Sequence, residues 1–161
     1  LKIALKYKPD YVCIVPEKRK EITTEGGLNL KKKRSFIKKM IKKLKRKKIK
    51  VSLFIEPNIS DIKISKSIDA DSVELHTGKY CKVFKNKKNE AIEFQRIKKS
   101  ADFAKKILLN VHAGHGLTYQ STKKICKLTN ISEFNIGHFI ISESIFLGLK
   151  KSIKKFKQII N

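Results

Sequence analysis

Residues 108–119, LLNVHAGHGLTY, join a short apolar run to a polar turn that is rich in glycine. A short, nearly continuous apolar run is typical of a strand that is buried on both faces of a sheet. Glycine and histidine follow the run, and a helical pattern comes next. This order predicts one strand–helix unit of a parallel α/β fold, with its polar residues at the carboxyl end of the strand, where such folds bind ligands.

Four other stretches repeat this order of strand, polar turn and helix. The five predicted strands are Asp10–Val15, Val51–Ile55, Ser72–Leu75, Leu108–Ala113 and Glu133–Ile136. Between them, apolar residues recur at steps of three and four, which predicts amphipathic helices. The expected apolar faces are Phe36, Ile37, Met40, Ile41 and Leu44, then Phe94, Ile97, Ala101, Ala104 and Leu108, and finally Ile145, Leu149, Ile153, Phe156 and Ile160. Asn58 and Asn89 are candidate N-caps.

Strands that alternate with helices indicate either a doubly wound sheet or a TIM (β/α)8 barrel. Four of the seven glycines and all four histidines lie at or just beyond the predicted strand ends, which favours a barrel with its site at the carboxyl edge. A complete barrel has eight strands and about 250 residues, whereas this sequence has 161 residues and begins with a helical segment, Leu1–Lys8. We therefore expect residues 1–161 to form a single partial TIM-barrel domain, the last five βα units, with the N-terminal strands missing.

The chain carries a formal net charge of +25, which first suggests a nucleic-acid-binding protein. Only four of its 39 basic residues are arginine, the residue that groove-reading proteins favour. The densest run, Lys31–Lys50, also contains one apolar face, so its lysines are expected to cover the solvent side of a helix. A non-catalytic phosphate- or nucleic-acid-binding fragment is the alternative interpretation.

No apolar run approaches the length of a membrane span, and the three cysteines show no CxxC spacing. We expect a cytoplasmic protein without a disulfide framework, a metal site or a membrane association.

The strand ends carry the candidate site. Thr23 belongs to a polar TTEGG segment suited to phosphate oxygens, and Glu74 is a carboxylate whose burial is costly unless it is hydrogen-bonded or used. His115 lies between two glycines, where an imidazole can move a proton near neutral pH. Gly137 and His138 precede the last helical segment, where barrels commonly bind phosphate.

The order PEKR, TTEGG, VSLFIEP, ELHTG, AGHGLTY, NIGH and FLGL resembles the pyridoxine 5′-phosphate synthase family, over essentially the whole of residues 1–161. The resemblance implies a TIM-barrel enzyme of vitamin B6 biosynthesis. Such an enzyme condenses 1-deoxy-D-xylulose 5-phosphate with 3-amino-2-oxopropyl phosphate, releases phosphate and water, and needs no cofactor. Its partners would be these two phosphorylated substrates and further copies of the same chain, with no nucleic acid.

The resemblance also implies roles for individual residues. Thr23 would contact the xylulose phosphate, Glu74 would stabilise the transition state, and His115 would donate a proton. The amino-oxopropyl phosphate would be held by Gly116, Gly137 and His138. The chain departs from the family in two respects. His112 stands where the family usually has asparagine, and the N-terminal NxDH segment and the His and Glu general bases have no counterpart. The segment alone is therefore expected to be inactive.

Overall fold

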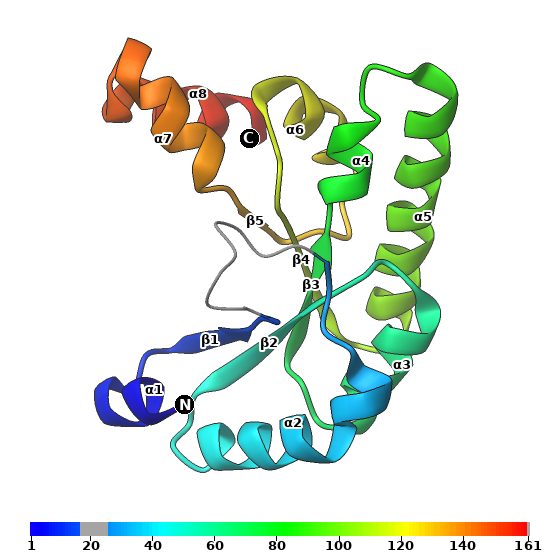
Figure 1. Cartoon of the computed structure of the whole chain (residues 1–161), viewed down its shortest axis with the longest axis vertical. Coiled ribbons are helices and arrows are strands. Elements are labelled where there is room, and N and C mark those ends of the chain that lie inside the picture. Colours follow the sequence, from blue (N-terminus) through cyan, green and yellow to red (C-terminus); the bar gives the residue numbers. More distant parts are fainter. Residues whose placement is uncertain (17–25, 161) are drawn as a thin grey trace.

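The computed structural model describes residues 1–16 and 26–160, and in this part of the chain five parallel strands form one curled sheet, a half-barrel (Figure 1). The order along the sheet is the order along the chain: β1 (Tyr11–Ile14), β2 (Lys50–Ile55), β3 (Ser72–His76), β4 (Asn110–Gly114) and β5 (Glu133–Asn135). All five predicted strands are confirmed. The architecture is that of a partial TIM barrel of about five βα units.

The bounds of the helices are α1 (Lys2–Tyr7), α2 (Leu30–Lys45), α3 (Ile59–Ser67), α4 (Gly78–Lys82), α5 (Lys87–Lys106), α6 (Tyr119–Ile125), α7 (His138–Leu147) and α8 (Leu149–Ile160). Helices α2 to α6 connect the strands, as parallel pairing requires, while α1 precedes β1 and α7 and α8 follow β5. The helices α2, α3 and α5 pack along the sheet, and α7 and α8 form a pair that contacts α6 (Figure 1). Asn58 caps α3 as expected, because its side chain accepts a hydrogen bond from the Asp61 backbone N–H at 2.8 Å.

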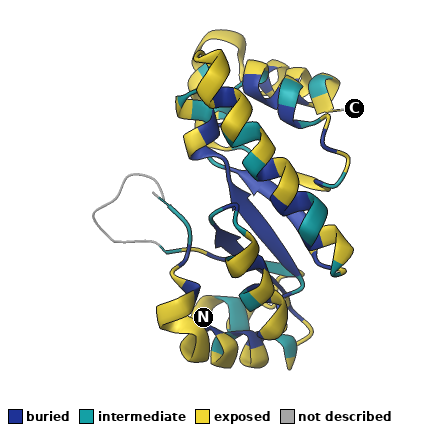
Figure 2. Ribbon diagram, turned by 90° about the vertical axis from the view of Figure 1, so that its right-hand side faces the viewer, coloured by how far each residue is buried: buried dark blue, intermediate teal, exposed yellow. Residues whose placement is uncertain are grey.

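The core lies between the central strands and the helices outside them. Every residue of β3 is buried, and so is all of β2 and β4 except the first residue of each, as expected of parallel strands covered on both faces. Figure 2 shows the central strands in dark blue beneath helices whose outer surfaces are exposed. The predicted faces of α2 and α5 supply buried Ile37, Ile41 and Leu44, and Ile97, Ala101 and Ala104.

The lysines of the basic run cover the outer face of α2, as predicted. Lys31, Lys38 and Lys42 are exposed, while Ile41 between them is buried. Phe36, however, was wrongly assigned to the buried face, since its side chain is 64% exposed. Neighbouring helical residues point about 100° apart, so Phe36 cannot share the direction of Ile37.

Three further expectations about the helices were wrong. Leu108 follows the end of α5 in a turn with φ 55°, and it is exposed while Leu109 is buried. Gly148, with φ 77°, separates α7 from α8, so Ile145 and Phe156 do not share one helix face. The N-cap of α5 is Asn86 and not Asn89, because the Asn86 side chain accepts from the Asn89 backbone N–H.

The register of the strands brings their carboxyl ends to one edge. Glu74 lies opposite Phe54 on β2 and His112 on β4, and Gly114 lies opposite both His76 and Asn135. The residues that follow β2, β3, β4 and β5 therefore meet around the same opening. His112 lies within β4 and not beyond its end, so it belongs to the sheet itself.

Candidate active site

Glu74 is the buried carboxylate at the centre of this edge. The Asn135 side chain on β5 donates to Glu74 Oε2 at 2.8 Å, and the Cys13 thiol on β1 donates to the same oxygen at 3.4 Å. A Cβ atom at Gly114 on β4 would overlap Glu74 Oε1, so the glycine leaves the space that this carboxylate occupies. Burial raises the pKa of Glu74, and the two donors oppose that shift. Three strands therefore hold one carboxylate in one orientation.

Cys13 is bound to this carboxylate as a thiol. Its pKa is raised to about 12, first by the desolvation of the thiol, and then by the charge of Glu74 and the hydrogen bond to it. Since the thiolate is the reactive form, a raised pKa makes Cys13 a hydrogen-bond donor and a poor nucleophile.

We expect Cys13 to be alkylated by iodoacetamide at pH 8 about 10²-fold more slowly than free cysteine, because its smaller thiolate fraction outweighs the higher nucleophilicity of that thiolate. The rate can be measured by mass spectrometry of the Cys13 peptide. Glu74→Gln removes the negative charge that disfavours the thiolate, so it should accelerate the reaction. Alkylation at the rate of free cysteine in the unsubstituted chain would contradict the raised pKa of Cys13 and the placement of its thiol against Glu74.

The turn that carries His115 has an unusual backbone. His115 has φ 82° and Gly116 has φ 75°, so two successive residues occupy the left-handed region. For a residue other than glycine this conformation costs about 1–3 kcal/mol and persists only where its surroundings enforce it. Thr77 supplies that support, because its hydroxyl lies 2.8 Å from the Gly114 carbonyl oxygen and 2.6 Å from that of His115. The turn thus projects an imidazole from the end of β4.

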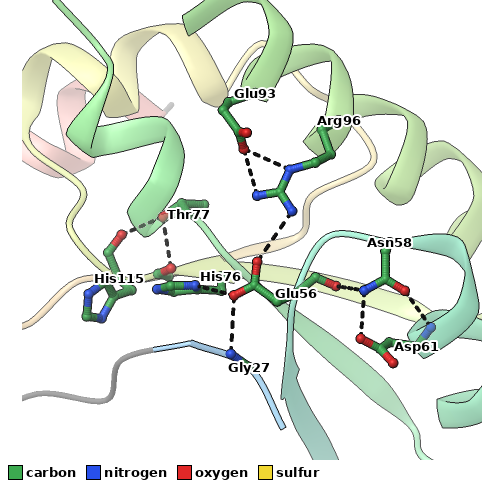
Figure 3. A network of polar contacts seen from close by, with 10 residues as sticks. Gly27, Glu56, Asn58, Asp61, His76, Thr77, Glu93, Arg96 and His115 are labelled. Carbon is green, nitrogen blue, oxygen red and sulfur yellow. Dashed lines mark hydrogen bonds and ion pairs between the residues drawn. The ribbon is translucent and has the colours of Figure 1, made fainter. Parts of the chain in front are cut away.

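A second polar network lies beside this turn (Figure 3). Glu56, which follows β2, lies 2.8 Å from His76 Nδ1 and 3.3 Å from Arg96 Nη1. It also accepts a hydrogen bond from the Gly27 backbone N–H at 3.2 Å. The His76 hydrogen bond, with help from Arg96, lowers the pKa of Glu56 to about 2, so this carboxyl group is ionised at neutral pH. The His76 ring then packs against the His115 ring, with 4.7 Å between centroids.

A cleft of about 430 Å³ opens between the His115 turn and the start of α7. Its walls include four of the six predicted site residues, His115, Gly116, Gly137 and His138, together with Asn135. Helix α7 begins at His138, and the first backbone N–H groups of a helix have no partner within it. Such a helix start attracts anions, phosphate in particular.

The structure therefore brings most of the predicted site together. Glu74 joins the cleft through Asn135, which both lines it and binds the carboxylate. Thr23 lies outside the described residues. Asn135, Thr77 and Glu56 were not predicted as site residues, although they lie within the motifs NIGH, ELHTG and VSLFIEP. The available signal was a polar residue at the end of a strand, as for Asn135, or directly after one, as for Glu56 and Thr77.

His112, which stands where the family motif has asparagine, contacts residues of the two edge strands, β1 and β5. It lies 3.4 Å from the Glu133 carboxylate and packs against the Tyr11 ring at 5.7 Å between centroids. Burial lowers its pKa, and Glu133 opposes that shift.

Within residues 1–16 and 26–160, no group of three or more His, Cys, Asp and Glu side chains is arranged to hold a metal ion. The same described residues contain no helix with the length and apolar character needed to cross a membrane.

A parallel half-barrel whose carboxyl edge joins a buried glutamate, a projecting histidine and a helix start defines a protein of the (β/α) barrel class, in which ligands bind at this edge. The comparison with known families agrees. Residues 1–161 match the family model described as pyridoxal phosphate biosynthesis protein PdxJ, and the chain belongs to this family.

Three relatives named pyridoxine 5′-phosphate synthase are similar to nearly the whole chain. The chain is 54% identical over 159 residues to the pyridoxine 5′-phosphate synthase of Pelagibacter ubique, covering 99% of this chain and 66% of the relative. It is 49% identical to that of a Sulfurihydrogenibium species, covering 98% of this chain and 64% of the relative, and 48% identical to that of Ehrlichia canis, with 99% and 65% covered. The chain thus spans about two thirds of the length of these relatives.

Proposed function

We propose that this chain is the larger part of a pyridoxine 5′-phosphate synthase. The whole enzyme would condense 1-deoxy-D-xylulose 5-phosphate with 3-amino-2-oxopropyl phosphate to pyridoxine 5′-phosphate, releasing phosphate and water. The relatives that share about half of its residues are named for this product. Residues outside the chain would supply the general bases, so the 161 residues alone would not catalyse the condensation.

One observation carries the proposal. The cleft at the start of α7 is lined by His115, Gly116, Gly137 and His138, and Asn135 links it to buried Glu74. A phosphorylated substrate needs backbone N–H groups at a helix start, a proton donor within reach and a fixed charge or dipole facing the reacting atoms. The cleft offers a candidate for each.

The roles follow from this placement. His115 would protonate the departing or reacting oxygen, and Glu74 would stabilise the charge that develops in the transition state. Gly116, Gly137 and His138 would bind the amino-oxopropyl phosphate at the start of α7. Thr23 would contact the xylulose phosphate.

The setting of the enzyme is part of the same proposal. Both substrates are phosphorylated small molecules, and a net charge of +25 would raise their local concentration near the protein. The enzyme would act in the cytoplasm as a homo-oligomer, without nucleic acid as a partner.

Binding to the cleft can be tested with this chain alone. On titration of ¹⁵N-labelled protein with 3-amino-2-oxopropyl phosphate, we expect saturable shifts of the amide signals of Gly116, Gly137 and His138. A parallel titration with random duplex DNA tests the alternative function. Shifts confined to the lysines of α2 with both ligands, and weakened steeply by salt, would contradict the proposal and favour a general polyanion binder.

Turnover requires the remaining third of the enzyme. This third can be supplied by a chimera that joins the chain to the parts of the Pelagibacter ubique relative outside the matched region. The two proteins are 54% identical over 159 residues, which favours compatible contacts between the joined parts.

A further inference from the structure

Glu56 and His76 lie beside the candidate site but have no part in the proposed reaction. Both come from motifs at strand ends, Glu56 after β2 and His76 at the last position of β3. Their side chains meet at 2.8 Å, between Glu56 Oε1 and His76 Nδ1. Because this contact between a carboxylate and an imidazole lies so close to the His115 turn, we asked how it acts on His115.

The carboxylate determines which nitrogen of His76 carries a proton. An ionised carboxylate only accepts hydrogen bonds, so His76 Nδ1 must donate. Carboxylates orient catalytic and metal-binding histidines in the same manner. In the neutral ring, His76 Nε2 then holds the lone pair.

Arg96 holds the carboxylate in turn. It reaches Glu56 Oε2 from α5 at 3.3 Å and pairs with Glu93 on the same helix at 2.6 Å. Glu56 also binds the Gly27 backbone. Helix α5 and the segment before α2 both hold the carboxylate, and the carboxylate in turn restricts the orientation of the His76 ring.

The other side of the His76 ring faces His115. A Cβ atom at Gly78 would lie 2.5 Å from His76 Nε2 and 2.9 Å from His115 Cδ2, so both rings rest over the same glycine. The two ring planes meet edge to face, at 63°. His76 Nε2 is buried, and it has no hydrogen-bond partner among the described residues. His76 does not line the 430 Å³ cleft, so it meets that cleft through His115, and the two rings also line a smaller pocket of about 180 Å³ beside Glu56.

We propose that His76 is a positioning residue: Glu56, anchored by Arg96, holds its ring in a single tautomer and orientation, and the ring restricts the orientation of the His115 imidazole. The role of His115 as proton donor rests on the proposed function, whereas the arrangement of the rings does not. Positioning matters for such a donor because a displacement of about 1 Å can cost about 10²-fold in rate.

The tautomer can be measured without any activity. In the 161-residue chain with ¹⁵N-labelled histidine, there are four imidazoles to assign. At a pH where His76 is neutral, we expect long-range ¹H–¹⁵N correlations to show a protonated Nδ1 and an unprotonated Nε2. The opposite tautomer, or a mixture of the two, would overturn the proposal, and this measurement requires no variant.

Two variants test the effect on His115. Glu56→Gln should give His76 a mixed tautomer and shift the ring signals of His115, whose neighbouring ring has become free to turn. Asp102→Asn is the matched control, because it removes a carboxylate from an ion pair with Lys98 on the same helix as Arg96. It should leave the His76 and His115 signals unchanged. Unaltered His115 ring signals in a folded Glu56→Gln protein would overturn the proposal.

The chimera adds a kinetic readout. His76→Phe keeps a ring over Gly78 but removes the Nδ1 donor, and we expect kcat to fall about 10- to 100-fold with little change in KM. Asp102→Asn should leave both constants unchanged. A wild-type kcat for His76→Phe would overturn the positioning role. An inactive chimera whose NMR signals still show the predicted tautomer would instead count against the proposed function alone.

Discussion

His115→Asn is expected to lower the turnover of the chimera by about 10²–10⁴-fold, the contribution of a well-placed general acid. The left-handed turn and the Thr77 hydroxyl project this side chain from the end of β4 into the cleft. Asparagine fits a backbone with positive φ, so the turn should survive the change. Its amide cannot deliver a proton near neutral pH. Steady-state assays of pyridoxine 5′-phosphate formation should show the loss in kcat.

The chain offers a matched control three residues earlier. His112→Asn makes the same substitution within β4, where the side chain contacts Glu133 and Tyr11 and not the cleft. Asparagine is also the residue that the family usually has at this position. We expect this variant to keep most of its turnover. Equal losses in the two variants would assign the effect to the strand and remove His115 from the mechanism.

Gly27→Ala should cause the largest loss of stability among the single-methyl changes that we consider. A Cβ atom there would overlap the Glu56 backbone nitrogen and lie 2.5 Å from the Ile55 carbonyl carbon. These are backbone atoms at the end of a buried strand, which cannot move aside as a flexible side chain can. Overpacking of this kind costs about 1–3 kcal/mol in the free energy of unfolding. Urea denaturation followed by circular dichroism measures the change.

Gly137→Ala is the corresponding control for stability. Gly137 has φ −114°, and a Cβ atom there would meet nothing within 4 Å. Its substitution should leave the free energy of unfolding unchanged or raise it slightly, because alanine restricts the unfolded chain. If Gly27→Ala unfolds at the same urea concentration as Gly137→Ala, the close approach of residue 27 to the end of β2 does not exist in solution.

Local patterns in the sequence were sufficient to predict the sheet. Continuous apolar runs such as Val51–Ile55 need burial on two faces, and only a parallel sheet covered by helices provides it. Periodicity was less reliable where a single backbone angle decides the outcome. Leu108 continued the helical spacing of α5, but a turn with φ 55° places it in solvent. Gly148 likewise ends α7 and separates its apolar residues from those of α8.

The candidate site was predictable only as a set of positions at strand ends. Its hydrogen bonds join residues far apart in the chain, since Glu56 and Arg96 are 40 positions apart and Glu74 and Asn135 are 61 positions apart. No local spacing encodes such pairs, because strand register and helix placement create them. Gly114 illustrates the same limit. As a residue beside His115 it suggested a tight turn, and the structure shows that it also makes room for Glu74.

The most direct test of the proposed function is the balance of products formed by the chimera. When it is incubated with 1-deoxy-D-xylulose 5-phosphate and 3-amino-2-oxopropyl phosphate, ³¹P NMR can follow both substrates, inorganic phosphate and pyridoxine 5′-phosphate together. We predict that phosphate and pyridoxine 5′-phosphate appear in equal amounts, and that His115→Asn suppresses both. A folded chimera that consumes neither substrate, or that releases phosphate without forming pyridoxine 5′-phosphate, would contradict the account.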